Sequence, residues 1–288
     1  MKVTITGASG FVGTALKSAL RGSGHTVCEL GRASAMRWDP TSGEPPAESL
    51  AGADAVVHLA GEPVAQRWNT EVKHRIRESR VRGTRHLIQA LSTSSPRPAV
   101  LVCASAVGIY GSRGDEILTE KSAPGKGFLP GVCAEWEKEA DLAEALGIRV
   151  VKLRIGIVLG SKGGALAKML PPFRACVGGR LGSGRQWMSW IHIDDLTGLI
   201  RHALENPVTG AVNGTAPAPV TNADFTAKLA SALHRPAIFP VPGFAVRALF
   251  GEMAEVLLGS QRVLPAVALD SGYKFRYDLV EAALKNLV

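Results

Sequence analysis

The sequence predicts an α/β fold in which helices cover both faces of a doubly wound parallel sheet. Short β-rich runs alternate with amphipathic stretches through the first half of the chain, as they do in α/β proteins. The β-rich runs lack period-two alternation, which is typical of strands covered on both faces. A glycine-rich turn follows the first run directly, as it does in Rossmann-type folds.

Strands are expected where short apolar runs stand between turn-forming residues, and helices where apolar residues recur at helical spacing. The expected helices lie near 11–22, 71–92 and 134–146. The expected strands are Val3–Thr6, Thr26–Leu30, Ala55–Leu59, Ala99–Ala104 and Val150–Leu153.

After Leu153 the composition changes and predicts a smaller, mostly helical C-terminal lobe. Glycine and proline are frequent through Gly160–Gly184, where we expect loops. A strand is expected at Trp187–Ile193 and a helix from Asp194 to about Asn206. We expect a Rossmann domain at 1–155, extended to about 235 by segments that return to the sheet, and a small helical domain at 236–288. A ligand cleft between the two lobes would follow.

Composition excludes several classes of protein. A hydrophobic content of 46% excludes a disordered chain. The longest apolar run, Ala99–Ala104, is far shorter than the roughly 20 residues of a membrane helix, so no membrane partner is expected. No export segment is expected either. The four cysteines stand far apart without metal-ligand spacing, which predicts a cytoplasmic protein with no metal site.

The formal net charge of +8 raises the question of nucleic-acid binding. No helix-turn-helix, RNA-binding or zinc-finger signature accompanies the charge, so nucleic acid is not the expected partner. We expect a small-molecule substrate and a monomer or homodimer. Arg180 and Arg185, in the glycine-rich stretch, either bind an anionic substrate such as a nucleotide sugar or only keep a loop soluble.

The turn after the first run has the features of a dinucleotide phosphate site. Its glycines permit a tight turn and let backbone amides approach a pyrophosphate, while the N-terminus of the following helix attracts the anion. Gly13 allows the helix to pack closely on the strand. The spacing is G-x-x-G-x-x-G, and the residues expected to bind the cofactor are Gly7, Ser9, Gly10, Phe11, Val12 and Gly13.

The end of the second strand favours NADP(H) over NAD(H). NAD enzymes usually place an acid there to bind the ribose 2′-hydroxyl. In this chain the strand ends in Gly31-Arg32, and an arginine suits a 2′-phosphate. Glu29 is the rival, but it lies inside the strand. Arg32 could also be an ordinary exposed loop arginine.

Three further groups have a structural reading beside a functional one. His58 and His192 lie inside apolar runs and are expected to be satisfied core histidines. Asp194-Asp195, and likewise Thr221 with Asp224, have the pattern of helix N-caps. Most arginines of the 71–92 helix form a solvated face. Arg80 lies at the margin of the apolar stripe, from which it could equally reach inward toward a cofactor.

Four stretches of the chain resemble extended short-chain dehydrogenases/reductases: Gly7–Gly13, Val56–Gly61, Ser105–Gly111 and Trp190–Asp195. Six more resemble one atypical branch of that class, the nucleoside-diphosphate-sugar epimerase-like family with a C-terminal domain of unknown function: Gly61-Glu62, Arg67–Asn69, Glu78–Arg80, Trp136-Glu137, Gly251–Met253 and Gly259–Pro265. The resemblance covers essentially the whole chain. It implies a Rossmann-type cofactor domain with these NADP(H) contacts: Gly31, Arg32, Leu59, Ala60, Gly61, Glu62 and Arg80.

The resemblance also implies a catalytic tyrosine in a Tyr-x-x-x-Lys motif, which this chain lacks. Four residues beyond its three tyrosines stand Gly114, Tyr277 and Glu281. Where the motif is expected, the chain reads Phe128 to Glu137 without tyrosine or lysine.

Three readings remain for the chemistry. Ser105 and Tyr110 are the candidate catalytic residues, with Glu135 or Glu137 as a partner. Ser105 could instead satisfy a strand-end backbone group, and Tyr110 could be a packing residue. Cys133 has no activating neighbour in sequence and is expected to be a buried apolar residue.

Two function hypotheses follow. The first is an NADP(H)-dependent oxidoreductase or epimerase that acts on a small polar substrate. The second is an NADP(H)-binding regulatory or interaction protein that has lost catalysis. The missing motif favours the second, whereas Ser105 and the cleft favour the first.

Overall fold

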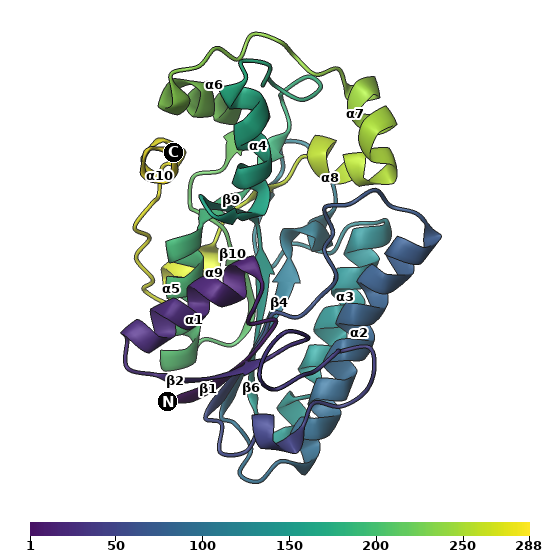
Figure 1. Cartoon of the computed structure of the whole chain (residues 1–288), viewed down its shortest axis with the longest axis vertical. Helices are drawn as coiled ribbons and strands as arrows, with labels where there is room; N and C mark the ends of the chain where they lie inside the picture. The colour runs from purple at the N-terminus through teal and green to yellow at the C-terminus, as the bar shows by residue number, and fades with distance from the viewer.

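Six parallel strands form the central sheet of this computed structural model, which describes residues 1–288 (Figure 1). Their order is β2-β1-β3-β4-β6-β10, and every neighbouring pair is parallel. The predicted doubly wound α/β fold is therefore confirmed. The strands are β1 Lys2–Thr6, β2 Thr26–Leu30, β3 Ala55–His58, β4 Val100–Ala106, β6 Arg149–Ile155 and β10 Gly210–Gly214.

Helices cover both faces of this sheet, as the absence of alternation along the strands predicts. On one face lie α1 (Phe11–Gly22) and α5 (Ile193–Glu205), and on the other lie α2 (Thr70–Thr93) and α3 (Phe128–Asp141) (Figure 1). Leu16 and Leu20 of α1 are fully buried in the apolar core on one face of the sheet. Leu87 and Leu91 of α2 are fully buried in the apolar core on the other face. The strands are thus desolvated on both sides.

The glycine-rich segment Gly160–Gly184 does not consist of loops alone, as the sequence predicts. It contains the helix α4 (Gly164–Arg174), which follows the strand β7 (Ile157–Gly160). Leu166, Leu170 and Phe173 are buried at helical spacing, and this apolar face outweighs the two prolines inside the helix. The expected strand at 187–193 is two short strands, β8 (Trp187–Met188) and β9 (Trp190–His192).

Of the two expected helix N-caps, one is confirmed and the other is wrong. Thr221 does cap α6, accepting a hydrogen bond from the Asp224 N–H. The N-cap of α5 is His192, whose Nδ1 accepts from the Asp194 N–H, rather than an aspartate. Asp195 instead accepts hydrogen bonds from two backbone N–H groups, at 276 and 277, and so ties the C-terminal segment to α5.

The last fifty residues have no core of their own. Most of their buried side chains belong to clusters shared with earlier elements: Met253 packs with Trp68, Val263 with Tyr110, and Leu284 with α6. No helix has the length and apolarity needed to cross a bilayer. The remaining helices are α6 Asn222–Leu233, α7 Gly243–Phe250, α8 Ala254–Leu258, α9 Ala266–Asp270 and α10 Val280–Leu287. The remaining short strands are β5 Ile117–Leu118, β11 Val220–Thr221 and β12 Arg262–Val263. The 3-10 turns are η1 Ala47–Ser49, η2 Val107–Tyr110, η3 Glu144–Leu146 and η4 Gly251–Met253.

Candidate functional site

The glycine-rich turn after β1 lies where the strand order reverses, between β1 and β3. Ligands of open α/β sheets bind outside the carboxyl ends of the strands at such a point. Gly7 has a φ of +68°, and a Cβ there would lie 2.9 Å from the Ala60 nitrogen and the Leu59 carbonyl oxygen. A Cβ on Gly13 would lie 2.3 Å from the Gly7 oxygen. The structure thus brings the turn and the Leu59-Ala60 segment together. Gly7 and Gly13 must be glycines because neighbouring backbone atoms occupy the space that a Cβ would need.

A buried hydrogen-bond chain fixes the two strand ends beside the turn. The Thr6 Oγ1 accepts from the backbone N–H groups of Leu59 and Ala60, both at 3.1 Å, so its proton goes to His58 Nδ1 at 2.7 Å. The Nε2–H of His58 then points to the Thr84 hydroxyl, 3.1 Å away. Burial lowers the pKa of His58 to about 3, so the ring is neutral. His58 is a satisfied core histidine, as predicted.

The first turn of α1 offers open backbone N–H groups to an anion. Gly10 is the N-cap and no side chain caps the helix, which leaves the N–H groups of Phe11 and Val12 available. The Phe11 ring turns into a recess formed by three glycines: Cβ atoms on Gly160, Gly163 and Gly164 would lie 2.5, 2.7 and 2.8 Å from it. Phe11 can therefore serve an anion only through its backbone.

The end of β2 has the features that suit a phosphate better than a hydroxyl. Glu29, the rival for a ribose contact, is paired with Lys17 at 2.7 Å and Arg21 at 2.9 Å. The hydrogen bond from Lys17 is the main reason that the pKa of Glu29 is lowered. Arg32 is exposed, whereas the Ser34 Oγ is buried without a partner, 3.3 Å from the position of a Cβ on Gly31.

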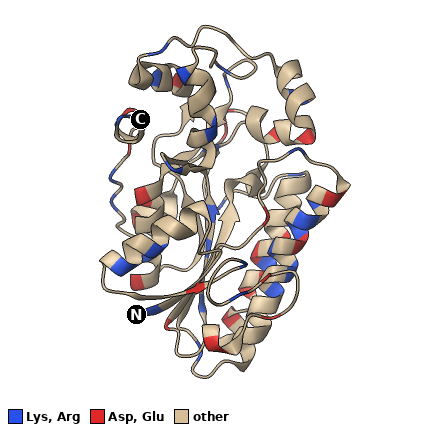
Figure 2. Cartoon of the chain, viewed as in Figure 1, with Lys and Arg blue, Asp and Glu red and all other residues tan.

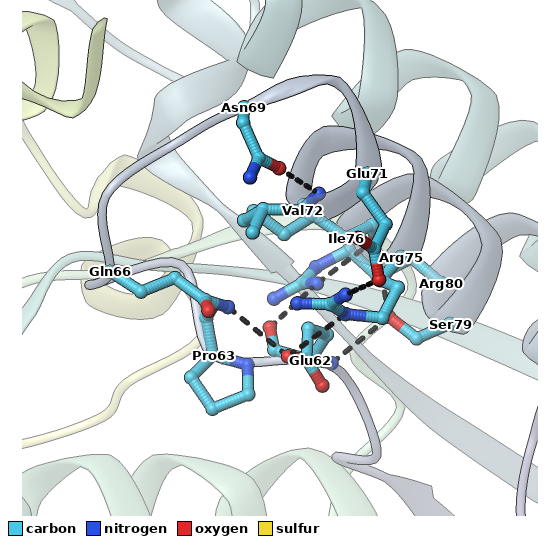
Figure 3. A network of polar contacts seen from close by, with 10 residues as sticks. All are labelled: Glu62, Pro63, Gln66, Asn69, Glu71, Val72, Arg75, Ile76, Ser79 and Arg80. Carbon is cyan, nitrogen blue, oxygen red and sulfur yellow. Dashed lines mark hydrogen bonds and ion pairs between the residues drawn. The ribbon is translucent and has the colours of Figure 1, made fainter. Parts of the chain in front are cut away.

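Arg80 is half-buried, whereas the other arginines of α2 are exposed. The others alternate with acidic residues along α2 and α3 on the surface (Figure 2), as Arg77 does with Glu135. Arg80 Nη1 donates to the Glu62 and Ile76 carbonyl oxygens, at 3.0 and 3.1 Å (Figure 3). The guanidinium lies 5.2 Å above the ring of Trp136 and 3.2 Å from the position of a Cβ on Gly61.

Glu62 is held by its neighbours in this network (Figure 3). Its N–H donates to the Ser79 hydroxyl at 2.9 Å, and its Oε1 accepts from Gln66 Nε2 at 3.1 Å. The polar network therefore fixes the segment after β3, next to the turn.

Ser105 and Tyr110 lie in a buried polar network on the ends of β4, β6 and β10. The Ser105 hydroxyl donates to Glu137 Oε1 at 2.7 Å. The Tyr110 hydroxyl donates to Asn213 Oδ1 at 2.7 Å and accepts from Arg154 Nη1 at 2.9 Å. Tyr110 is 0% exposed, and burial raises its pKa. Each hydroxyl has its partner inside the protein, so a catalytic role for either residue stays a prediction that this network disfavours.

The helix that should carry the tyrosine and lysine presents apolar groups instead. Phe128 packs edge-on against Trp68, with ring centroids 5.3 Å apart. Cys133 is 3% exposed and burial raises its pKa to about 11, which keeps the thiol protonated. Its expected role as a buried apolar residue is confirmed.

Sequence reasoning missed Arg154, Asn213 and the recess around Phe11. The one available signal for Arg154 was its place directly after the predicted strand Val150–Leu153. Nothing local marks Asn213, because its strand is a short one between two glycines. The three glycines of the recess lie in the stretch Gly160–Gly184, where the sequence predicts loops and gives no sign of a contact with Phe11.

Comparison with known proteins agrees with this geometry. The model of the NAD dependent epimerase/dehydratase family matches residues 3–216, and that of a domain of unknown function, DUF1731, matches residues 241–287. The epimerase family protein SDR39U1 homolog of Arabidopsis thaliana, a chloroplastic protein, is 44% identical over 302 residues, covering 100% of this chain and 87% of that protein.

Solved structures give the same picture. The crystal structure of the human epimerase family protein SDR39U1 (isoform 2) with NADPH matches with a TM-score of 0.91 and 37% identity, covering 100% of this chain and 99% of that one. A nucleoside-diphosphate sugar epimerase from Corynebacterium glutamicum matches with a TM-score of 0.81 and 39% identity, covering 99% of this chain and 57% of that one. This chain belongs to the NAD dependent epimerase/dehydratase family.

Proposed function

We propose that the chain binds NADP(H) in preference to NAD(H). The pyrophosphate would lie against the turn at 7–13, where the open N–H groups of α1 meet it. Arg32 would bind the 2′-phosphate, and Gly31 leaves room for it. The single observation that carries the preference is Glu29, which is already paired with Lys17 and Arg21 and so is not free to select a 2′-hydroxyl. The human relative crystallised with NADPH supports this assignment.

Arg80 extends the proposed site toward the nicotinamide half of the cofactor. Within the protein only its Nη1 donates hydrogen bonds, so Nε–H and Nη2–H remain for cofactor oxygens. It lies beside Gly61, which with Leu59 and Ala60 follows the strand next to the turn. NADP(H) supplies hydride chemistry when bound; Arg80 would supply a fixed positive charge next to it. The resemblance to extended short-chain dehydrogenases/reductases implies a lysine for that charge, in the Tyr-x-x-x-Lys motif that this chain lacks.

For the chemistry, the geometry favours an NADP(H)-binding regulatory or interaction protein. Proton transfer needs a positioned acid or base, but Ser105 and Tyr110 are engaged in the buried network, and Cys133 is a buried thiol. The second candidate is an NADP(H)-dependent oxidoreductase or epimerase that acts on a small polar, possibly nucleotide-linked, substrate. It is favoured by the match of residues 3–216 to the model of the NAD dependent epimerase/dehydratase family.

One experiment separates these two candidates. The protein is saturated with NADPH, and oxidation is followed at 340 nm with a panel of carbonyl compounds and nucleotide sugars. The regulatory proposal predicts stoichiometric NADPH binding and no NADPH oxidation above the rate measured without a substrate. Turnover that exceeds this background would establish the oxidoreductase, and failure to bind NADPH would remove both candidates.

A further inference from the structure

Two segments of the C-terminal half carry the whole formal net charge of +8. Residues 160–193 and 225–251 together contain eight Lys and Arg and no Asp or Glu, and the 25 Lys and Arg elsewhere equal the 25 Asp and Glu of the chain. The rest of the chain is therefore electrically balanced. The eight residues are Lys162, Lys168, Arg174, Arg180, Arg185, Lys228, Arg235 and Arg247.

The two segments pack against each other at one end of the molecule. The Val241 N–H donates to the Arg180 carbonyl oxygen and the Val241 carbonyl oxygen accepts from the Gly182 N–H, both at 2.8 Å. In Figure 1, the loop that leaves α6 and enters α7 crosses the end of the molecule farthest from β1 and β2. We call residues 174–185 and 235–249 the basic end.

The positive charge of the basic end is not neutralised within the chain. Its five arginines are exposed and make no ion pair. The acidic residues that flank the second segment, Asp224 and Glu252, are bonded to Thr221 and Lys73. The basic end therefore presents a positive field to solvent, which attracts an anionic partner.

The basic end also exposes large apolar side chains. The five most exposed large apolar residues of the chain all lie there: Phe244 at 75%, Ile238 at 71%, Leu249 at 67%, Val177 at 60% and Phe239 at 58%. Single exposed apolar residues are ordinary, but a group of them on one surface marks an interaction site.

The helix α7 turns an apolar side outward. Only Val246 of its eight residues is buried. Phe244 and Ala248 lie on the side of the helix opposite Val246, and both are exposed, as is Arg247 beside them. A surface helix normally presents polar residues to water. The pattern of α7 is instead that of a helix whose outer side contacts a second apolar phase.

We propose that the basic end docks on the surface of an anionic lipid bilayer. The exposed apolar side chains would enter the boundary between headgroups and acyl chains, and the arginines would bind lipid phosphates. Such docking needs no spanning helix. The apolar side chains favour lipid over nucleic acid, whose phosphates supply charge without an apolar layer. A second copy of the chain is disfavoured, because like charges would face each other across the contact.

Cosedimentation of the full chain with lipid vesicles tests the role of charge. Vesicles of phosphatidylglycerol and phosphatidylcholine in equal amounts should bind the protein, and vesicles of phosphatidylcholine alone should bind it far more weakly. Arg247→Gln should weaken binding to the anionic vesicles about fivefold, because it removes one charge near the surface. The matched control is Arg82→Gln, an exposed arginine of α2, which should leave binding unchanged.

A second pair of variants tests the apolar contact. Phe244→Ser should weaken binding to the anionic vesicles about tenfold, because it removes a ring that the bilayer would bury. The matched control is Leu142→Ser, which changes a side chain that is 52% exposed at the end of α3 and should leave binding unchanged. Neither substitution removes a buried group, and circular dichroism checks that each variant is folded.

Three results would overturn the proposal: no binding to the anionic vesicles, equal binding to the two kinds of vesicle, or equal losses in Phe244→Ser and Leu142→Ser. Without vesicle binding, retention on a DNA duplex that depends on Arg247 would assign the surface to nucleic acid, and self-association that Phe244→Ser abolishes would assign it to a second copy. Arg32→Glu should leave vesicle binding unchanged, so this proposal and the NADP(H) proposal can fail separately.

Discussion

Arg154 of β6 and Glu137 of α3 form a bidentate ion pair inside the protein, with Nε–Oε1 and Nη2–Oε2 distances of 2.8 Å. Both side chains are only 9% exposed. The pair also binds both candidate catalytic hydroxyls, Ser105 through Glu137 and Tyr110 through Arg154. These two hydroxyls are therefore parts of a structural network that joins the strand ends to α3.

Glu137→Gln should destabilise the protein by about 3 kcal/mol, because it leaves the buried Arg154 charge without its partner. Urea unfolding measures the change. The matched control is Glu135→Gln on the same helix, which breaks the exposed pair with Arg77 and should cost under about 1 kcal/mol. Equal effects of the two substitutions would show that the buried pair is not the stabilising element.

Ser105→Ala and Tyr110→Phe should leave NADPH affinity unchanged and lower the free energy of unfolding by about 1 to 2 kcal/mol each. The reason is that each removes a hydroxyl whose partners lie inside the protein. Fluorescence titration and urea unfolding measure the two quantities. A variant that lost NADPH turnover at unchanged stability would restore a catalytic role.

Gly160→Ala should weaken NADPH and NADH binding to the same degree and destabilise the protein by about 1 to 3 kcal/mol. The added methyl would lie 2.5 Å from the Phe11 ring and displace the residue that begins α1. The matched control is Gly131→Ala, whose methyl meets open space on α3 and should stabilise the helix by about 0.5 to 1 kcal/mol. Unchanged cofactor affinity in Gly160→Ala would show that the recess does not position the turn.

Stability should fall as the pH is lowered from 7 to 5. The pKa of His58 is about 3 in the folded protein and about 6.5 in the unfolded chain, so between these values only the unfolded chain gains the proton. The contribution of His58 is complete above pH 6.5 and is lost toward pH 3, by about 2 kcal/mol at pH 5. Urea unfolding at the two pH values measures it. His58→Asn should show a smaller pH dependence, and an equal one would assign the effect to other groups.

Local sequence patterns were sufficient to predict the strands and helices around the sheet core. The strand at Thr26–Leu30 and the helix at 11–22 are where apolar spacing puts them, because local spacing and burial agree there. The helix α4 lies where frequent glycine and proline predict loops, and the burial of Leu166 and Leu170 against the rest of the fold stabilises it there.

The buried network could not be predicted, because it depends on pairs far apart in sequence. Tyr110 of η2 meets Asn213 of β10, and Ser105 of β4 meets Glu137 of α3, only once the sheet has formed and α3 has packed on it. The side of the sheet to which Ser105 points is set by register, not by its place after an apolar run. The glycine turn was predictable because its chemistry lies within eight consecutive residues.

Titration of the purified chain with NADPH and with NADH tests the central claim most directly, in wild type and in Arg32→Glu. The account predicts that wild type binds NADPH at least about tenfold more tightly than NADH. Arg32→Glu should abolish or reverse that preference, whereas Arg235→Glu, the same charge change on the C-terminal lobe, should preserve it. Equal affinity of wild type for the two cofactors, or a preference unchanged by Arg32→Glu, would contradict the account.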